Sequence, residues 1–238
     1  FWVQEPECLA TRGCHMLFAA RTSSRPGSLE ARHRSRPSRR RVAAQARHIL
    51  LVEDDTNLAV WQRQLPLHIS DFAQLLLSLN EPLAESLCLE LPDEDAEPDL
   101  AGLALGFRDL EGYEGFIADV SWLISAFACL LGARRIGVRV RALDKAMCPR
   151  FHVDHVPVRL ITTYAGLGSQ WLGEDAMSRQ HLGNVLAEPE DCQHMLCGEV
   201  ALLKGEKWQG NEGFGLVHRS PQPLSGERRL ILTLDWLA

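Results

Sequence analysis

The chain has 238 residues, of which 46% are apolar, and a formal net charge of −6. This composition suffices for a hydrophobic core and excludes a globally disordered chain. The negative charge argues against a nucleic-acid-binding coat, so we expect no nucleic-acid partner. The seven cysteines are scattered, without a C-x-x-C pair. This pattern favours a reducing compartment over a disulfide framework, and we expect a cytoplasmic location.

Residues 1–47 differ in composition from the rest of the chain. They contain ten arginines, no lysine and three acidic residues. No apolar periodicity is present, so we expect a disordered Arg-rich extension followed by a single domain over 48–238. If Met16 were the start, this extension would resemble a mitochondrial transit peptide. A nucleic-acid-binding arm is disfavoured because the arginine-rich stretch lacks interleaved aromatic residues.

The part from 48 to 134 is predicted to be a mainly helical scaffold. From 61 to 89 apolar side chains recur at helical spacing, with a break at the Asn80-Glu81-Pro82 segment, which predicts one or two helices. Residues 115–132 predict a buried helix. The apolar run at 122–133 is too short to cross a bilayer, so we expect no membrane partner.

The pattern changes at Arg135, where apolar and polar residues alternate as in a half-exposed strand. Short β-rich runs are predicted at 135–143, 147–164 (broken at Pro157), 200–204, 213–218 and 228–236. Many short strands with Gly and Pro turns indicate a sandwich or barrel. We therefore expect an α+β fold, in which the helical part packs on a C-terminal metal-binding β-barrel over 135–238.

Three residues of the β-rich part could hold a metal ion. His152 and Asp154 are two apart, so on a strand both side chains leave the same face. His218 lies on another predicted strand. Two histidines and one carboxylate leave coordination positions open, which is typical of non-haem Fe(II) oxygenases. Each residue alone is more simply explained as structural, but the order and spacing of the set favour a metal site.

An arginine ten residues after His218 adds a further element. Arg228 starts the last predicted strand and shares a face with the three leucines of Leu-Ile-Leu-Thr-Leu, the uniformly apolar set that we expect to point inward. Arg229 shares a face with the mixed set. We therefore expect Arg228 to be the buried cation. An arginine directed into an apolar barrel without an anion is costly, so a bound dicarboxylate is a natural partner.

The region from His152 to Arg228 resembles the iron- and 2-oxoglutarate-dependent oxygenases. In that family an H-x-D pair, a distal His and a following Arg recur, and His218-Arg-Ser-Pro-Gln-Pro-Leu-Ser-Gly-Glu-Arg228 fits this pattern. The resemblance implies a double-stranded β-helix, a barrel of the jelly-roll or cupin-like kind. It also implies Fe(II) on His152, Asp154 and His218, and 2-oxoglutarate with its far carboxylate on Arg228. The implied activity is hydroxylation of an unknown small-molecule or protein substrate.

From about residue 48 the chain also resembles a bacterial family known as domain of unknown function 1826. The segments that carry this resemblance are Asn57-Leu-Ala-Val-Trp61, Met147-Cys-Pro-Arg-Phe-His-Val-Asp154, Thr163-Tyr-Ala-Gly-Leu-Gly168 with Trp171, Leu203-Lys-Gly205 and Val217-His-Arg-Ser-Pro221. The family brings no established activity. Its association with bacterial zinc-limitation gene sets implies a link to metal homeostasis.

Alternatives remain open at this point. Cupin-like barrels with similar ligands also serve as simple metal binders, so the same residues could belong to a non-oxygenase zinc-binding protein. Arg150, Arg159, Tyr164 and Trp171 are candidate substrate residues at the barrel mouth, and they could equally form its rim. The Cys192-Gln-His-Met-Leu-Cys197 segment is favoured as a loop with incidental cysteines over a second zinc site, because its spacing is loose.

Overall fold

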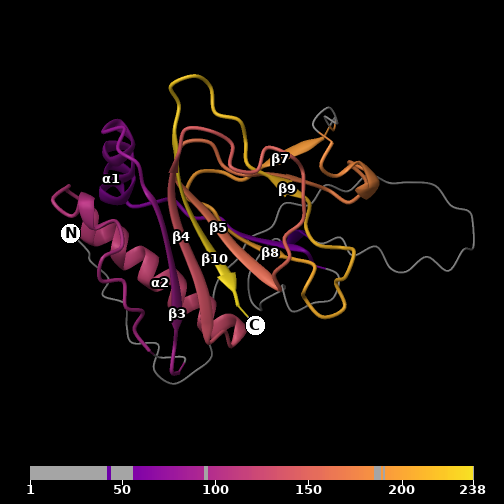
Figure 1. Ribbon diagram of the computed structural model, residues 1–238, viewed down its shortest axis with the longest axis horizontal. Coiled ribbons are helices and arrows are strands. Elements are labelled where there is room, and N and C mark those ends of the chain that lie inside the picture. Colours follow the sequence, from indigo (N-terminus) through magenta and orange to yellow (C-terminus); the bar gives the residue numbers. More distant parts are fainter. Residues whose placement is uncertain (1–41, 44–55, 94–95, 185–188, 190, 238) are drawn as a thin grey trace, which may run out of the picture.

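The computed structural model describes residues 42–43, 56–93, 96–184, 189 and 191–237. A large sheet and a small sheet face each other, and two α-helices cover the outer side of the large sheet (Figure 1). Apart from one parallel pair, β1 with β2, the paired strands are antiparallel. The fold is therefore mixed α/β with mostly antiparallel sheets.

The described elements can be placed by their order in the chain. They are β1 (Val42–Ala43), β2 (Leu58–Trp61), α1 (Leu67–Ser78), β3 (Ala84–Glu90), η2 (Leu105–Phe107), α2 (Tyr113–Leu131), β4 (Arg135–Leu143), β5 (Val158–Ala165), β6 (Gln170–Leu172), η3 (Arg179–His181), β7 (Cys192–His194), β8 (Val200–Lys204), β9 (His218–Arg219) and β10 (Arg229–Trp236). The large sheet has the order β1-β2-β8-β5-β10-β4-β3, and the small sheet has the order β7-β6-β9. Strands far apart in the sequence are thus neighbours in both sheets.

The two α-helices pack closely on each other and on the sheet. The buried side chains of α1 are Ile69, Phe72, Ala73, Leu76 and Leu77, which is the spacing of one helix face. α2 follows Gly112 and ends at Gly132, and both glycines have positive φ. A Cβ at Gly112 would lie 2.1 Å from the carbonyl oxygen of His68. The glycine therefore allows the two helices to approach at this point.

The helix expected at 115–132 is confirmed as α2. By length and composition α2 could cross a membrane. In the structure it lies along the large sheet (Figure 1), where the Phe116 ring contacts the rings of Phe72 and Tyr164. Its apolar side chains thus form part of the core between the helices and the sheet.

Both faces of the large sheet are largely buried, but against different partners. The outer face packs on the helices through a mainly apolar layer that includes Val138, Leu160 and Leu232. The inner face packs on the small sheet through a second cluster that includes Ile161 and Ile231. Successive residues of β10 therefore alternate between the helix-facing core and the space between the two sheets.

The expected division into a mainly helical part over 48–134 and a β part over 135–238 is not supported, although both α-helices lie in the first part. β2 and β3 come from 48–134, yet both are strands of the large sheet. The helix expected to continue towards residue 89 ends with α1, and the chain then forms β3. The physical reason is a period of two, because Leu87 and Leu89 pack on the helix-side core while Ser86 and Cys88 are exposed.

The remaining strand predictions were largely confirmed. β4, β8 and β10 coincide with predicted runs, whereas the run at 213–218 contributes only the two-residue strand β9. Within the extension expected to be disordered, Val42 and Ala43 form β1 beside β2. The rest of 1–47 lies outside the described residues, so that prediction stays untested.

Candidate metal centre

The structure brings His152, Asp154 and His218 together. His152 lies between β4 and β5, and His218 is the first residue of β9. Their backbones form an isolated antiparallel bridge, in which each amide donates to the carbonyl oxygen of the other residue over 3.0 Å. The two imidazole ring centres are 4.6 Å apart. One nitrogen or oxygen atom from each of the three side chains lies within 4.8 Å of the others.

Backbone carbonyls fix the orientation of both imidazoles. Nδ1 of His152 is 2.9 Å from the carbonyl oxygen of Arg150, and Nδ1 of His218 is 3.1 Å from that of Leu216. A carbonyl only accepts, so we assign the proton to Nδ1 in each ring. This leaves the Nε2 lone pairs directed at Asp154. Such a hydrogen bond behind a ligating imidazole is the usual support of a metal site.

Asp154 presents one carboxylate oxygen that has no hydrogen-bond donor. Its Oδ1 accepts from Arg159 Nη1 over 2.6 Å, whereas Oδ2 is buried and lacks a hydrogen-bond partner within the described part of the chain. His218 Nε2 lies 3.3 Å from Oδ2, and His152 Nε2 lies 3.9 Å from Oδ1. Two ligands of one ion, each about 2.1 Å from it, are separated by roughly 3.0–3.4 Å. The His218–Asp154 distance lies in this range and the His152–Asp154 distance is longer. The three side chains are close enough together to hold a divalent cation, and the donor set suits iron or zinc.

The charge states of Asp154 and His152 favour the binding of a cation. Burial alone would raise the pKa of Asp154, but the neighbouring His218, Arg159 and His152 outweigh it and lower the pKa to about 2. Burial and the neighbouring His218 lower the pKa of His152, so its ring stays neutral at neutral pH. Asp154 and His218 are buried, whereas the His152 side chain is 32% exposed. The group is thus open to solvent on the His152 side.

Arg159, which was predicted as a substrate residue, binds the candidate metal ligand Asp154. Its Nη1 binds Asp154, while Nε and Nη2 donate to Asp235 on β10 over 2.5 and 3.0 Å. Asp235 is also the acceptor of Arg139 on β4. A continuous chain of ion pairs therefore connects the candidate metal ligand with three strands of the large sheet, β5, β10 and β4.

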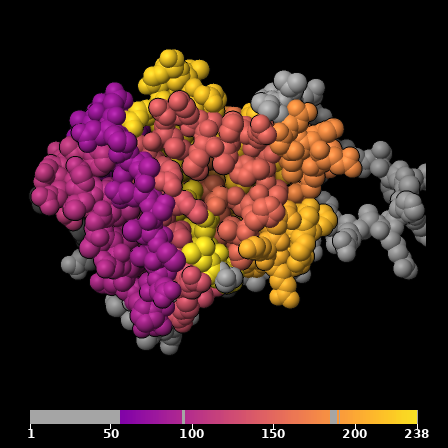
Figure 2. Space-filling model, viewed as in Figure 1, coloured from indigo at the N-terminus to yellow at the C-terminus, as the bar shows by residue number. Residues whose placement is uncertain are grey.

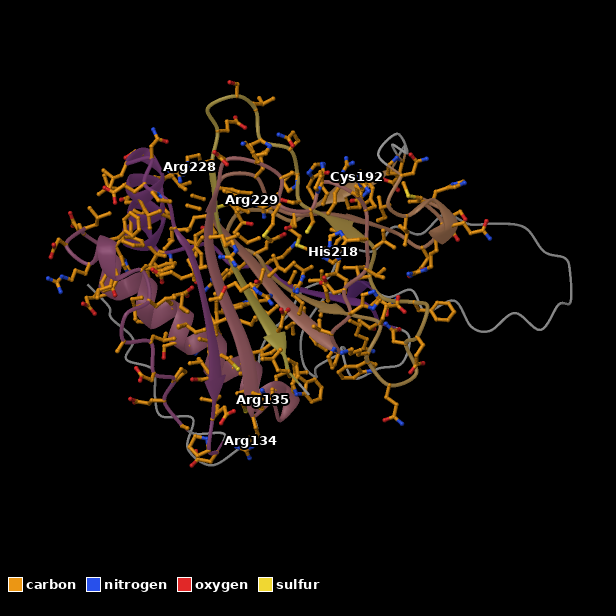
Figure 3. The ribbon with its side chains drawn as sticks, in the orientation of Figure 1. Arg134, Arg135, Cys192, His218, Arg228 and Arg229 are labelled. Atoms are coloured by element: carbon orange, nitrogen blue, oxygen red, sulfur yellow. The ribbon has the colours of Figure 1, made fainter. Side chains whose placement is uncertain are left out.

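The expectation that Arg228 is the inward cation is wrong. The Arg228 guanidinium donates to the carbonyl oxygens of Leu77 and Glu81 over 3.0 and 2.9 Å, at the C-terminal end of α1. Arg229 is the buried residue, 1% exposed. Figure 3 shows Arg228 on the side of α1 and Arg229 nearer to His218. The apolar face of β10 is indeed buried, but it faces the helices, so the mixed face with Arg229 points into the space between the sheets.

The Arg229 guanidinium lies among hydroxyl groups. It donates to Thr163 Oγ1 and Ser169 Oγ over 3.2 and 3.1 Å, and to Ser220 Oγ over 3.4 Å. Its Nε has no hydrogen-bond partner, and the described residues supply no carboxylate to it. Burial lowers the pKa of Arg229 to about 10. A buried arginine without a counter-charge, surrounded by hydroxyls, is suited to receiving a carboxylate.

The other predicted substrate residues are dispersed. Arg150 is exposed, and the contact that it makes to the group runs through its backbone carbonyl. Trp171 pairs with His218 across β6 and β9 and packs on the inter-sheet cluster. Tyr164 is buried on the opposite, helix-facing side, where its hydroxyl donates to Asp119 over 2.6 Å. Tyr164 is therefore directed away from the triad.

Several residues near the triad were not predicted from the sequence. Arg229, Asp235 and the hydroxyls of Thr163 and Ser169 were not predicted. The alternation of Arg229, Thr233 and Asp235 on one face of β10 is the sequence pattern that could have indicated a polar inner face.

A cleft of about 450 Å³ lies beside α1 and is lined in part by Arg228 and Arg229, away from the triad. In the described ranges the triad is the one group of His, Cys, Asp and Glu that could hold a metal ion.

The two-sheet fold and the His-Asp-His group define a mixed α/β protein with a candidate metal centre. The chain belongs to the family described as "Protein of unknown function (DUF1826)", whose model matches residues 46–235. This confirms the family resemblance inferred from the sequence. A comparison with curated proteins gives no match.

Several solved structures are similar to the chain at low identity. A Pseudomonas putida prolyl-4-hydroxylase has 12% identity and a TM-score of 0.42, with 79% of this chain and 95% of that chain covered. A bsmA homolog from Methylobium petroleophilum has 13% identity and a TM-score of 0.41, with 76% and 91% covered. An oxidoreductase of the 2OG-Fe(II) oxygenase family from Burkholderia pseudomallei has 11% identity and a TM-score of 0.35, with 78% and 85% covered. At these TM-scores the likenesses establish neither a shared fold nor a shared function.

Proposed function

We propose that this protein is an Fe(II)- and 2-oxoglutarate-dependent dioxygenase that hydroxylates a substrate. The observation that carries the proposal is Arg229, a buried cation that has no carboxylate partner among the described residues. It lies between the same two sheets as the His-Asp-His group, eleven residues after His218. A simple zinc-binding protein has no use for such a cation, whereas a dicarboxylate co-substrate needs one.

The side chains have distinct roles in this proposal. His152, Asp154 and His218 hold the iron, which together with 2-oxoglutarate supplies the oxidising chemistry of the hydroxylation. Arg229 binds the far carboxylate of 2-oxoglutarate, and nearby hydroxyls such as those of Thr163 and Ser169 help to orient it. Arg159 holds Asp154 in place. The open side at His152 admits the substrate.

We further propose that the two facing sheets are the halves of a double-stranded β-helix. The strands β8, β5, β10 and β4 are neighbours in the large sheet. The segments between them in the chain supply β6, β7 and β9, which form the small sheet. The bridge from His152 to His218 adds a fourth segment to the small sheet. This arrangement supports the proposal because it places two ligands on paired segments of one layer.

The proposed function can be tested on metal-free protein under anaerobic conditions. Addition of Fe(II) and 2-oxoglutarate is expected to produce the visible charge-transfer band of the iron chelate. Asp154→Ala should abolish the band by removing a ligand, while Arg150→Gln, which changes an exposed side chain, should retain it. If the wild-type protein shows no band and instead binds zinc tightly, the alternative of a zinc-binding protein linked to metal homeostasis replaces the oxygenase. Affinity alone does not decide, because zinc usually outcompetes iron at such ligands.

The cellular location and the partners of the protein are predictions. We propose a cytoplasmic location from the free cysteines, and neither a nucleic-acid nor a membrane partner from the charge and the apolar pattern. Fractionation of cells that produce the protein is the direct test of the location. Recovery of the protein in the membrane fraction would contradict it.

A further inference from the structure

The small sheet leaves part of the inner face of the large sheet uncovered. The large sheet contributes buried side chains to the inter-sheet cluster from β2, β5, β8 and β10. β3 contributes none, and β4 contributes only the partly buried Leu143 at its end. On β3 the inner-face residues Ala84, Ser86 and Cys88 are exposed. They are paired across to Arg141, Arg139 and Gly137 of β4. Figure 2 shows purple atoms beside a hollow in which yellow atoms of the C-terminal part are recessed.

We call this open surface the β3–β4 platform and define it by five residues. They are Ala84, Ser86, Cys88, Arg139 and Arg141. The platform adjoins the candidate metal centre through side-chain contacts. Arg139 and Arg159 bind the same carboxylate, Asp235, and Arg159 binds Asp154. Arg141 is paired across to Ile231 of β10, two positions from Arg229 on the same face.

Positive charge exceeds negative charge where the platform meets the metal centre. Arg139, Asp235, Arg159 and Asp154 are joined by ion pairs and balance in charge. Arg141, two positions from Arg139 on the same face of β4, adds one positive charge to this group. A divalent cation on Asp154 would increase the excess. Where a substrate approaches, the surface therefore favours an anion.

Arg141 is the member of the group with free donors. Its Nη2 donates to Ser86 Oγ over 3.1 Å, and the described residues provide no carboxylate for it. The other arginines of β4 differ, since Arg139 binds Asp235 and Arg135 lies 3.5 Å from Glu90. Arg141 is also half-buried, so an ion pair there is less screened by solvent than one on an open surface. A planar guanidinium of this kind binds carboxylate or phosphate through two hydrogen bonds.

We propose that the substrate is an anion that lies on the β3–β4 platform, with its carboxylate or phosphate group held by Arg141. Arg139, the next residue on that face, stays paired with Asp235 and borders the anion. The uncharged part of the substrate extends over the platform to the open, His152 side of the metal centre. This inference rests on the proposed function, because the bound molecule is the one that the metal centre would hydroxylate.

The test uses zinc-loaded protein saturated with 2-oxoglutarate, so that the ligand positions and Arg229 are occupied and no turnover occurs. Binding of phenyl phosphate, phenylacetate and neutral benzyl alcohol is measured by calorimetry. We expect at least one anion to bind and benzyl alcohol not to bind, and the better anion identifies phosphate or carboxylate as the recognised group. Arg141→Gln should weaken that anion about tenfold, the order expected for loss of a charge-assisted hydrogen bond. Arg135→Gln, on the same strand and face, should leave the affinity unchanged.

The outcomes separate this inference from the proposed function. Failure of both anions to bind, an unchanged affinity in Arg141→Gln, or an equal loss in Arg135→Gln would each overturn the inference. The iron chelate band is recorded for the same variants. If the band forms in wild type and in Arg141→Gln but anion binding does not depend on Arg141, the inference alone fails. If the band is absent while anion binding depends on Arg141, the proposed function fails and the anion site stands.

Discussion

Arg159 Nη1 donates to Asp154 Oδ1 over 2.6 Å, and the same guanidinium is held from behind by Asp235. Asp235 is 1% exposed, so this anchor is buried and its geometry is fixed. Because Oδ1 of Asp154 is occupied by Arg159, Oδ2 is left without a hydrogen-bond donor and lies 3.3 Å from Nε2 of His218. The ion pair therefore determines which carboxylate oxygen is available to a metal ion.

Replacing Arg159 should weaken metal binding without removing a ligand. In Arg159→Gln the carboxylate of Asp154 loses its charged partner and can rotate, so we expect the zinc affinity to fall about 10–100-fold. A competition titration with a chromophoric chelator measures this affinity. Arg135→Gln breaks only an exposed pair with Glu90 and serves as the control. An Arg159→Gln protein with wild-type zinc affinity would show that the ion pair does not orient Asp154.

The two adjacent arginines should separate co-substrate binding from stability. Arg229→Gln removes the buried cation, and we expect the 2-oxoglutarate affinity of the metal-loaded protein to fall by roughly 1.5–3 kcal/mol. Arg228→Gln leaves that cation in place, so its 2-oxoglutarate affinity should match the wild type. Calorimetric titration of zinc-loaded protein with 2-oxoglutarate gives both values. The reverse result would return the role to Arg228, as the sequence alone had indicated.

Arg228→Gln should instead lower the free energy of unfolding. Its guanidinium donates to two carbonyl oxygens near the end of α1, at Leu77 and Glu81. Loss of these hydrogen bonds should cost about 1 kcal/mol, measured by urea unfolding. Stability equal to the wild type would mean that water replaces the guanidinium at no cost.

Arg228 and Arg229 illustrate which parts of the site can be predicted from the sequence and which cannot. The spacing of His152 and Asp154 and the later His218 identified side chains that do come together, because period-two alternation fixes which residues share a face. The prediction for Arg228 is wrong because the uniformly apolar face of β10, on which Arg228 was placed, does not line the site. Both faces of β10 are buried, and the apolar one packs on helices.

Long-range partners explain most of the other misses. Arg159 and Asp235 are 76 residues apart, and nothing in either local pattern indicates that they pair. The sequence predicts a helix at β3 because nearby leucines also fit a helical period, and only the pairing of β3 with β4 shows that this segment is a strand. Local periodicity thus predicted elements and faces, whereas the contacts between layers had to come from the structure.

Acidification should destabilise the metal-free protein in two stages. The pKa of His152 lies below its ordinary 6.5 in the folded state, so the unfolded chain binds this proton first and stability falls as the pH drops below about 6.5. The pKa of Asp154 is lowered from 3.8 to about 2, so its contribution is present above 3.8 and lost as the pH falls towards 2. This second loss amounts to roughly 2 kcal/mol.

Urea unfolding at a series of pH values measures both stages. His152→Gln should remove the first stage, because the variant has no imidazole to charge at this position. His155→Gln, at an exposed neighbouring position, should keep it. If the stability of the wild-type protein stayed constant between about pH 7 and pH 5, the burial of a neutral His152 would be contradicted.

Tyr164→Phe should affect stability but not the metal centre. The hydroxyl of Tyr164 donates to Asp119 on the helix-facing side, and Asp119 is also held by the Arg63 guanidinium over 2.5 and 2.9 Å. The variant keeps the ring in the core and leaves Asp119 paired, so we expect a loss of about 1–2 kcal/mol in the free energy of unfolding. Zinc and 2-oxoglutarate affinities should equal those of the wild type, because the residue points away from the triad. A selective loss of 2-oxoglutarate binding at unchanged stability would instead place Tyr164 in the site and overturn the assignment of the two sheet faces.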